Sequence, residues 1–402
     1  MGDGARGASD GKGRRRARTA LVGAQVALAL IILNCAALFG RSFAALQHVR
    51  PGFQPDSVLT AYMTLPRRAY DSGYKMVRLY EQLQTSTATL PGVKQASAIY
   101  PLPMSGEPWS GSFAIEGARP DAEPPHAELA VTLPEYFHVM RIPILQGRDF
   151  TRADSKDAPL VVVVDEELAR KYWPRENPIG KRINALSPEG TWATVVGVVG
   201  HVHSLGPQQT SGPQLYTPFA QSPQPMLYTV MRTVVAPASL MGGLRQAVGS
   251  LDRDLAVSKL RTMDAVVATT TARPRFNLLM LTIFAAVALT LAAVGLYGVM
   301  SYLVAQRTRE IGIRIALGGR PSAVRMTIIR QSFTIALVGL AIGTVTTLGI
   351  SGLLSRLLFG VKGTDPVSYL VVSALLLTVT IVASYLPAQR ATRIDPILAL
   401  RG

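Results

Sequence analysis

Four long stretches of apolar residues interrupt an otherwise mixed chain. They cover residues 19–40, 277–304, 327–354 and 368–386. The hydrocarbon core of a bilayer is about 30 Å thick and needs about 20 helical residues to cross it. Each stretch therefore predicts a membrane-spanning helix. The first stretch is too long for the apolar part of a signal peptide and has no small-x-small cleavage site before Arg41, so we interpret it as an uncleaved anchor.

Between the first two stretches, residues 41–276 show the shorter patterns of a folded extramembrane domain. Three short apolar or β-branched runs predict strands, at residues 58–65, 160–164 and 194–199. The apolar spacing over residues 74–90 predicts a helix. Asp165 is placed to cap a short helix that ends before Pro174. The predicted fold is an α-helical membrane protein with four transmembrane helices and a large α+β extracytoplasmic domain between helices 1 and 2.

The distribution of charge orients these predicted helices. Six basic and two acidic residues fall within residues 1–19, and six basic and one acidic residue within residues 305–330. Lys and Arg in short loops resist translocation, so we predict that both termini and the 305–330 loop are cytoplasmic. The predicted domains are a basic cytoplasmic N-terminus (1–18), a first transmembrane helix (19–40), an extracytoplasmic domain (41–276) and a membrane domain (277–402).

Composition excludes several classes of function. The chain is 48% hydrophobic and 16% charged, which does not fit a wholly soluble protein. Its net charge is +16, but the basic residues flank the apolar stretches, so we expect contact with the lipid bilayer and no nucleic acid. The single cysteine, Cys35, excludes an intrachain disulfide. The sequence has no G-x-x-x-x-G-K-[ST] phosphate loop and no G-x-S-x-G elbow, so we predict no enzyme activity and no bound cofactor.

Two groups of polar residues in the outer segment are candidates for chemistry. His201 and His203 are two residues apart, as two metal ligands on one strand face would be. The sequence shows no carboxylate or third histidine close to them, so we interpret them as a surface pair. Asp165, Glu166 and Glu167 form an acidic run at the start of a predicted helix, where capping and the helix dipole explain them more simply than catalysis. We therefore predict no metal site and no catalytic residue.

The loop between the second and third apolar stretches is amphipathic. Over residues 307–318 the apolar side chains fall on a face opposite Arg309 and Glu310, which predicts a short cytoplasmic helix. Such a helix either lies on anionic lipid or docks on a cytoplasmic partner, and the residues alone favour neither. In the third stretch, Gly339 and Gly343 form a G-x-x-x-G face suited to close helix packing, although glycine is common in membrane helices generally.

Five segments carry motifs that point to one family. The sequences REIGIRIALG at 309–318 and ASYLPAQRATRIDPILALR at 383–401 resemble the FtsX-like permease domain of MacB-type ABC transporters. Three further segments look like the MacB-like periplasmic core domain: PEYFHVMRIPILQGRDF at 134–150, VVVVDEELARKYWPRENPIGKRI at 161–183 and VVGVVGHV at 195–202. Together the motifs resemble one family, the MacB/FtsX-like permeases, over nearly the whole chain.

This resemblance implies the permease subunit of an ABC transporter in a bacterial inner membrane. In that family the helix after the second span docks in a groove of a cytoplasmic ABC ATPase, which is the subunit that binds ATP. The implied docking residues are Arg309, Glu310, Ile311, Arg314, Ile315 and Gly318. The resemblance also implies a dimer with a second permease unit, which is identical or different. A periplasmic adaptor and an outer-membrane channel are further partners that it suggests.

The resemblance leaves several alternatives open. MacB-type proteins carry a fused ATPase, which this sequence does not show, so we expect the ATPase as a separate chain. The sequence is most similar to the second unit of two-unit permeases, and it is either a stand-alone half or part of a longer chain. Two other functions compete with transport: an FtsX-like regulator of a periplasmic hydrolase, and a membrane-anchored sensor that works without an ATPase.

Overall fold

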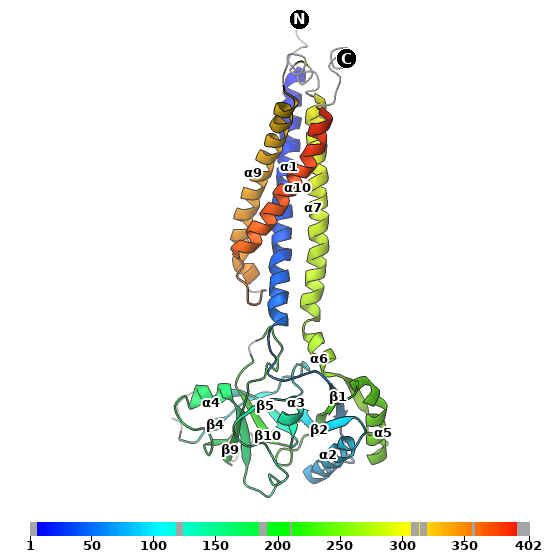
Figure 1. The fold of residues 1–402 in the computed structure, drawn as a ribbon. Coiled ribbons are helices and arrows are strands. Elements are labelled where there is room, and N and C mark those ends of the chain that lie inside the picture. The colour runs from blue at the N-terminus through cyan, green and yellow to red at the C-terminus, as the bar shows by residue number, and fades with distance from the viewer. Residues whose placement is uncertain are drawn as a thin grey trace. The chain divides into compact units, whose positions relative to one another are not determined.

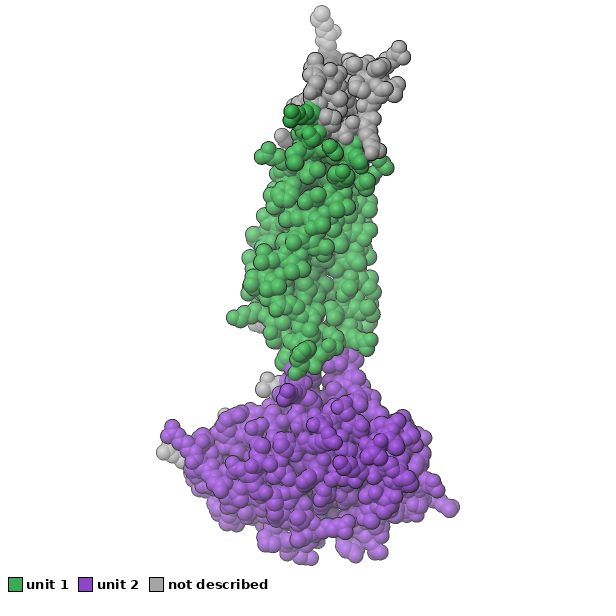
Figure 2. Space-filling model, in the orientation of Figure 1, with its two compact units in different colours: residues 1–48, 273–402 green, residues 49–272 purple. Residues whose placement is uncertain are grey.

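The computed structural model describes residues 6–117, 124–184, 191–209, 211–306, 313, 320–355 and 358–391. The chain forms two compact units, which Figure 2 colours separately. Residues 1–48 and 273–402 form the first, called here the membrane unit, and residues 49–272 form the second, called the outer unit. The outer unit is therefore a single insertion between the first helix of the membrane unit and the remaining ones.

Four long helices make up the described part of the membrane unit (Figure 1). They are α1 (Arg6–Gln47), α7 (Ala272–Gln306), α9 (Pro321–Ser355) and α10 (Pro366–Ala391). Each contains a stretch that is long and apolar enough to cross a membrane. Each predicted span lies inside one of these helices, and each helix extends beyond the predicted ends. The apolar pattern marks the part suited to lipid, whereas the helix itself continues into polar residues.

The predicted end of the fourth span, at residue 386, falls short of the end of α10. Pro387 lies inside this helix, which continues to Ala391. A proline removes one backbone donor, and membrane helices tolerate the loss where neighbouring groups take up the freed carbonyl. Ala388, the next residue, is fully buried. Tertiary packing therefore covers the turn that contains the proline.

The four helices share an apolar core. One buried cluster joins Val26 and Leu30 of α1 to Ala292 of α7, Leu340 of α9 and Leu376 of α10. More than 200 residues separate α1 from the other helices along the chain. Buried apolar side chains thus pack α1 against α7, α9 and α10.

One mixed sheet forms the centre of the outer unit (Figure 1). Its strands are β1 (Val58–Thr64), β2 (Val93–Tyr100), β3 (Ser110–Ser112), β4 (Ala114–Ile115), β5 (His126–Thr132), β6 (Ile144–Gly147), β7 (Val161–Asp165), β8 (Arg182–Asn184), β9 (Ala193–Val199), β10 (Gln214–Pro218), β11 (Met226–Thr233) and β12 (Val257–Thr262). Among the described residues the order is β12-β1-β11-β2-β5-β10-β7-β9-β8-β4, with β3 on β5 and β6 on β9. The pairs β5 with β10 and β7 with β9 are parallel, and the other pairs are antiparallel.

Helices cover both faces of this sheet. They are α2 (Gly73–Ala88), α3 (Tyr136–Met140), α4 (Glu166–Tyr172), the 3-10 helix η1 (Pro237–Leu240), α5 (Met241–Leu251) and α6 (Met263–Thr270). Leu59 and Met63 of β1 share a buried cluster with Leu83 of α2 and Leu244 of α5. Val58, the neighbour of Leu59, belongs instead to a cluster with residues of α3 and α6. Since successive strand residues point to opposite faces, β1 is buried on both sides.

The sequence patterns of the outer unit correspond to observed elements. The predicted strands at 58–65, 160–164 and 194–199 are β1, β7 and β9, and the predicted helix at 74–90 is α2. Asp165 caps α4 as predicted, because its side chain accepts a hydrogen bond from the backbone nitrogen of Leu168 at 2.8 Å. Four apolar helices and an α+β outer unit confirm the predicted fold class.

Candidate functional site

The predicted docking helix, residues 307–318, lies almost entirely outside the described residues. All six predicted docking residues lie outside them: Arg309, Glu310, Ile311, Arg314, Ile315 and Gly318. The flanking helices are described, since α7 ends at Gln306 and α9 begins at Pro321. Figure 1 shows the end of α7, the start of α9, the start of α1 and the end of α10 at the same end of the membrane unit.

Tyrosines and arginines connect three helices at this end of the membrane unit. The guanidinium of Arg18 in α1 lies 4.3 Å from the ring centre of Tyr302 in α7. Gln306 donates a hydrogen bond to the Tyr302 hydroxyl at 2.9 Å. Arg390 of α10 donates to the hydroxyl of Tyr297 at 2.9 Å. Basic and aromatic side chains of this kind are typical of the membrane–water interface.

The opposite end of the membrane unit is held by a different set of polar contacts. Arg41 of α1 forms an ion pair with Asp365. Asp365 also accepts hydrogen bonds from the backbone nitrogen and the hydroxyl of Ser368, at 2.9 and 2.7 Å. The hydroxyl oxygen of Ser42 accepts a hydrogen bond from the backbone nitrogen of Phe359 at 2.8 Å. Asp365 thus caps α10 and ties its start to the end of α1.

The two glycines predicted to form a packing face lie against α1. A Cβ atom on Gly339 would lie 2.8 Å from the carbonyl oxygen of Gly23 and 2.9 Å from Cβ of Val26. A Cβ atom on Gly343 would lie 2.8 Å from a methyl group of Leu30. These separations are too short for a real side chain. Helices α1 and α9 therefore approach this closely because both positions are glycine.

The sequence patterns missed a third close contact between helices. At Gly295 of α7, a Cβ atom would lie 2.2 Å from the side-chain oxygen of Gln25 in α1. Gly295 does not belong to a G-x-x-x-G pattern, so no local signal marks it. Gln25 is 270 positions earlier in the chain, and only the folded structure places it beside Gly295.

In the outer unit, the buried carboxylate of Asp165 joins three segments. Its Oδ1 atom accepts hydrogen bonds from the backbone nitrogens of Leu168, at 2.8 Å, and Gln214, at 3.0 Å. Its Oδ2 atom lies 2.5 Å from Nδ1 of His201. The start of α4, the start of β10 and the segment after β9 therefore meet at the end of β7. The side chain of Asp165 is fully buried, so its position is fixed by these contacts.

The interpretation of His201 as one of a surface pair without a carboxylate neighbour is wrong. Its side chain is only 16% exposed, and besides Asp165 it contacts Glu167, whose Oε2 lies 3.4 Å from Nε2 of His201. The hydrogen bond to Asp165 raises the pKa of His201, against the effect of burial. Burial, together with the nearby His201, lowers the pKa of His203. The sequence hid this cluster because its two halves follow different strands, β7 and β9.

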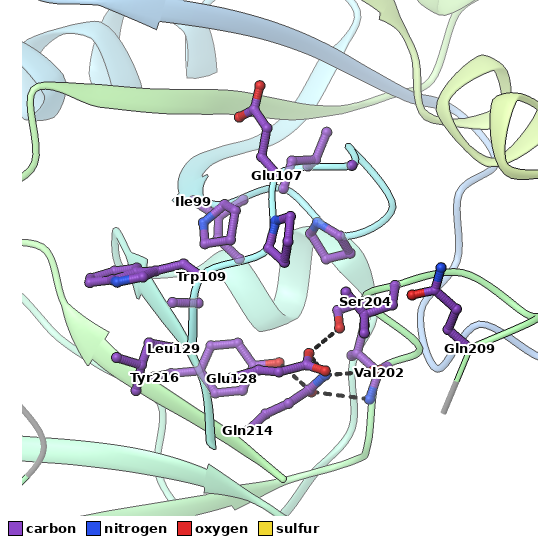
Figure 3. Close-up of a pocket in the computed structure, with 17 residues that line it drawn as sticks. Ile99, Glu107, Trp109, Glu128, Leu129, Val202, Ser204, Gln209, Gln214 and Tyr216 are labelled. Atoms are coloured by element: carbon purple, nitrogen blue, oxygen red, sulfur yellow. Dashed lines mark hydrogen bonds between the residues drawn. The ribbon is translucent and has the colours of Figure 1, made fainter. Parts of the chain in front are cut away.

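A cavity of about 260 Å³ lies in the outer unit between the turn after β2, strand β5 and the segment after β9 (Figure 3). Its wall is largely apolar and includes Trp109, Leu129 and Tyr216. The carboxylate of Glu128 lies on the opposite side of the cavity from Glu107, as Figure 3 shows. Because pockets of this kind bind ligands by apolar contact and a few polar groups, the cavity is a candidate ligand site.

The second carboxylate of the cavity, Glu107, belongs to a network with β11 and β12. Lys259 donates hydrogen bonds to Glu107 and, at 3.2 Å, to the hydroxyl of Tyr228. The hydrogen bond to Glu107 raises the pKa of Lys259. The Oε2 atom of Glu107 is buried and has no hydrogen-bond partner among the described residues. Figure 3 shows the carboxylate of Glu107 directed away from Glu128. The carboxylate of Glu128 accepts hydrogen bonds from Ser204, Gly212 and Gln214.

Two family models match the chain. The model of the MacB-like periplasmic core domain matches residues 22–248, and the model of the FtsX-like permease C-terminal domain matches residues 282–396. The first match begins within α1 and covers most of the outer unit. The second begins within α7 and includes α9 and α10. The outer unit is therefore matched mainly by the first model, and the last three membrane helices by the second.

Curated relatives and solved structures are similar to parts of the chain. The macrolide export ATP-binding/permease protein MacB of Agrobacterium fabrum is 29% identical over 279 residues, which cover 66% of this chain and 42% of that protein. MacB of Escherichia coli K12 is 28% identical over 276 residues, with the same coverage. The periplasmic region of MacB from Actinobacillus actinomycetemcomitans covers 57% of this chain and 98% of its own, at 18% identity and a TM-score of 0.38. The chain spans about two fifths of the length of these curated relatives.

Proposed function

This chain belongs to the MacB/FtsX-like family of ABC transporter permeases, and on that premise we propose that it couples a separate cytoplasmic ATPase to movements of the outer unit. One observation carries the proposal. The order of elements is a first membrane helix, an inserted outer unit, a second helix, the segment at 307–318 and two further helices. Family models match in the same order along the chain.

The proposed orientation places both termini and residues 307–320 in the cytoplasm of a bacterium, with the outer unit in the periplasm. The excess of basic residues in 1–19 and 305–330 supports it, because such residues resist translocation. An ATPase that binds residues 307–318 would then act from the cytoplasmic side.

The connections between the units suggest how movement passes from one to the other. Residues 307–318 join α7 to α9, so a force on this segment acts on both helices. At its other end, α7 begins at Ala272, two residues after the end of α6 in the outer unit. On the second path, α9 packs on α1 through Gly339 and Gly343, and α1 leads into the outer unit. We infer that closure of the ATPase rearranges the outer unit and that substrate is extracted or expelled there.

We infer that this chain takes part in transport and does not regulate a periplasmic hydrolase. The cavity of the outer unit, with its largely apolar wall and the side chain of Glu128, supports substrate binding. The curated relatives are named macrolide export proteins, which describes those proteins and makes efflux the leading hypothesis for this one. A second permease unit, a periplasmic adaptor and an outer-membrane channel complete the proposed assembly.

Affinity purification of the full chain in mild detergent tests the ATPase partnership. The wild type should recover an ABC ATPase. The double variant with Glu310→Arg and Arg314→Glu should insert into the membrane normally, since both residues lie outside the apolar stretches, but should recover much less ATPase. Loss of one desolvated charge pair alone costs about 2 to 5 kcal/mol of binding free energy. Arg325→Glu, a charge reversal in α9 outside the docking residues, is the matched control and should retain the ATPase.

Each other outcome points to a different function. Recovery of a peptidoglycan hydrolase with the ATPase would favour the regulatory role. If no ATPase accompanies the wild type, the sensor hypothesis replaces transport. If the double variant keeps its ATPase and the normal stimulation of ATP hydrolysis, the docking residues lie elsewhere. A change in dependence on anionic lipid alone would assign residues 307–318 to the membrane surface.

A further inference from the structure

Residues 201–206 follow strand β9 and are called here the junction segment. The backbone nitrogen of His203 donates a hydrogen bond to the carbonyl oxygen of Pro51 at 2.9 Å. Next to Pro51, Gly52 has a φ of +85°, and a Cβ atom on it would lie 2.0 Å from the carbonyl oxygen of His201. Glycine at this position therefore allows the two backbones to touch. Because α1 ends at Gln47, the junction segment contacts the chain where it enters the outer unit.

The end of the junction segment contacts the chain where it leaves the outer unit. A Cβ atom on Gly206, whose φ is +99°, would lie 3.3 Å from Cβ of Thr270. Thr270 is the last residue of α6, and α7 begins at Ala272. A single short segment therefore contacts both places at which the outer unit is connected to membrane helices.

The middle of the junction segment forms part of the cavity wall. The cavity is lined by Val202, Ser204 and Leu205. The carbonyl oxygen of Ser204 accepts a hydrogen bond from the backbone nitrogen of Met104 at 2.6 Å, which joins the segment to the turn after β2. Residues of that turn line another part of the cavity. A displacement of the junction segment would therefore change the cavity and both chain connections together.

The side chain of His201 holds the start of the junction segment. Its Nδ1 lies 2.5 Å from Oδ2 of the buried Asp165, and its Nε2 lies 3.4 Å from Oε2 of Glu167. A neutral imidazole donates from one ring nitrogen, whereas an imidazolium donates from both. Only the protonated ring can therefore donate to both carboxylates.

The titratable groups that face His201 are mostly acidic. They are Asp165 at the end of β7, Glu166 and Glu167 in α4, Glu128 in β5 and His203 in the junction segment. The hydrogen bond to Asp165 is the main cause of the raised pKa of His201, burial acts against it, and the charges of Glu167 and Glu128 raise it further. Burial and the nearby His201 lower the pKa of His203, so His201 takes up a proton first. On the side of Pro51 the basic residue is Arg50, which is exposed.

We propose that protonated His201 holds the junction segment in place, so that pH controls how firmly the cavity is joined to the two chain connections. The neutral ring loses one carboxylate partner, and the segment then opens more often. Because the folded pKa is raised, the stabilisation is present below the unfolded pKa of about 6.5 and is lost as the pH rises through the folded value. As a part of the coupling mechanism this proposal rests on the proposed function, but its test needs no ATPase.

Hydrogen exchange of the full chain in mild detergent tests the proposal. Protection of the backbone amides, corrected for the intrinsic exchange rate, is measured from about pH 6 to about pH 9 in peptides covering residues 50–54, 102–106, 201–206 and 266–271. In the wild type these peptides should lose protection together as the pH rises. In His201→Gln their protection at the acidic end should be lower by about tenfold or more, as expected for loss of a hydrogen bond to a charged group, and should not show this transition.

Glu167→Gln keeps Asp165 as a partner of His201 and should move the transition to lower pH, because one negative charge is removed. The matched controls are His126→Gln, at an exposed histidine, and Glu81→Gln in α2, and both should behave as the wild type. Amides of β1 and β11, which lie towards the other end of the strand order from β9, show whether each variant is folded.

Two results would overturn the proposal. A difference between wild type and His201→Gln that stays constant across the pH range would show that the charge of His201 has no part in holding the segment. A loss of protection confined to residues 201–206 would show that the segment does not join its neighbours. Either result would leave the ATPase partnership untouched, and failure to recover an ATPase would not alter the exchange measurements.

Discussion

Three buried hydroxyls of the membrane unit bond within their own helices, whereas a buried arginine of the outer unit bonds to segments far away along the chain. The hydroxyls of Ser332, Thr347 and Ser384 are fully buried among the membrane helices. Each donates to a carbonyl oxygen four residues earlier in its own helix, at 3.2, 2.7 and 2.6 Å. These side chains therefore satisfy their hydrogen bonds without a partner on another helix.

The outer unit contains the opposite arrangement at Arg232 of β11. This residue is only 4% exposed, and burial lowers its pKa. Its guanidinium donates to the carbonyl oxygens of Val139 at 2.6 Å and of Asp56 and Gln54 at 2.8 Å. These partners lie 93 to 178 residues earlier in the chain. Arg232 thus joins α3 to the segment before β1.

The difference shows what holds each unit together. A membrane helix satisfies its own backbone, so association of the helices depends on the fit of their surfaces, as at Gly339 and Gly343. In the outer unit the fold depends on polar groups from remote segments meeting in a buried place, where an unsatisfied group is costly. Substitutions in the outer unit should therefore reduce stability by removing hydrogen bonds, and substitutions in the membrane unit by disturbing the fit between helices.

The largest effect is expected for Arg232→Met. The change leaves three carbonyl oxygens without their donor, and each buried unsatisfied group costs about 1 to 3 kcal/mol. The free energy of unfolding of the outer unit should fall by about 3 kcal/mol or more. Unfolding of the full chain in urea is monitored by tryptophan fluorescence. This signal reports the unfolding of the outer unit selectively, because Trp109, Trp173 and Trp192 all belong to it.

Arg253→Met is the matched control, because Arg253 is exposed and a substitution there should change the free energy of unfolding by about 0.5 kcal/mol or less. The far-ultraviolet signal of the membrane helices should persist in Arg232→Met after the fluorescence transition. Equal midpoints for the two variants would show that the hydrogen bonds of Arg232 contribute little. Loss of both signals together would show that the units unfold as one.

The next effect concerns the helix contact between α1 and α9. Gly339→Ala and Gly343→Ala each place a methyl group against α1 where no space exists, and the overlap should cost about 1 to 2 kcal/mol. Gly349→Ala lies on the same helix with no described atom within 4 Å of its Cβ, so it should be neutral or stabilise by about 0.5 to 1 kcal/mol. Thermal loss of helicity in mild detergent measures all three, and equal midpoints would remove the packing role of these glycines.

The sequence predicted the membrane unit better than the outer unit, and the two kinds of contact explain why. An apolar stretch determines a membrane helix by its own composition, so each of the four long helices among the described residues was predicted. A G-x-x-x-G pattern also marked Gly339 and Gly343. The contact of Gly295 with Gln25 has no such pattern, because it depends on how two helices are rotated against each other.

In the outer unit, prediction succeeded only for elements with a strong pattern of their own. The buried strands β1, β7 and β9 were found, whereas β3, β4 and β8 are two or three residues long and show no periodicity. Asp165 was correctly assigned as a cap, but its contact with His201 depends on the pairing of β7 with β9. The cavity was missed for the same reason, since its lining residues include Trp109, Leu129 and Tyr216, which belong to three separate segments of the chain.

The smallest effect concerns an ion pair at the edge of the outer unit. Arg148 donates two hydrogen bonds to the carboxylate of Asp154, at 2.7 and 2.8 Å, and the backbone nitrogen of Thr151 donates a third at 2.8 Å. Burial alone would raise the pKa of Asp154, but these hydrogen bonds outweigh it and the pKa is lowered. A carboxyl group with a lowered pKa stabilises the fold above its unfolded pKa, near about 3.9, and loses this contribution as the pH falls through the folded value.

Asp154→Asn should therefore reduce the free energy of unfolding at pH 7 by about 1 kcal/mol, a modest amount because Arg148 is half exposed and water screens the pair. The deficit should shrink as the pH falls below about 4, because the wild-type carboxylate then takes up a proton and loses the same interaction. Urea unfolding followed by tryptophan fluorescence at several pH values measures the deficit, with the exposed Asp157→Asn as control. A deficit that stays constant from pH 7 to pH 3 would show that Asp154 acts through the geometry of its hydrogen bonds and not through its charge.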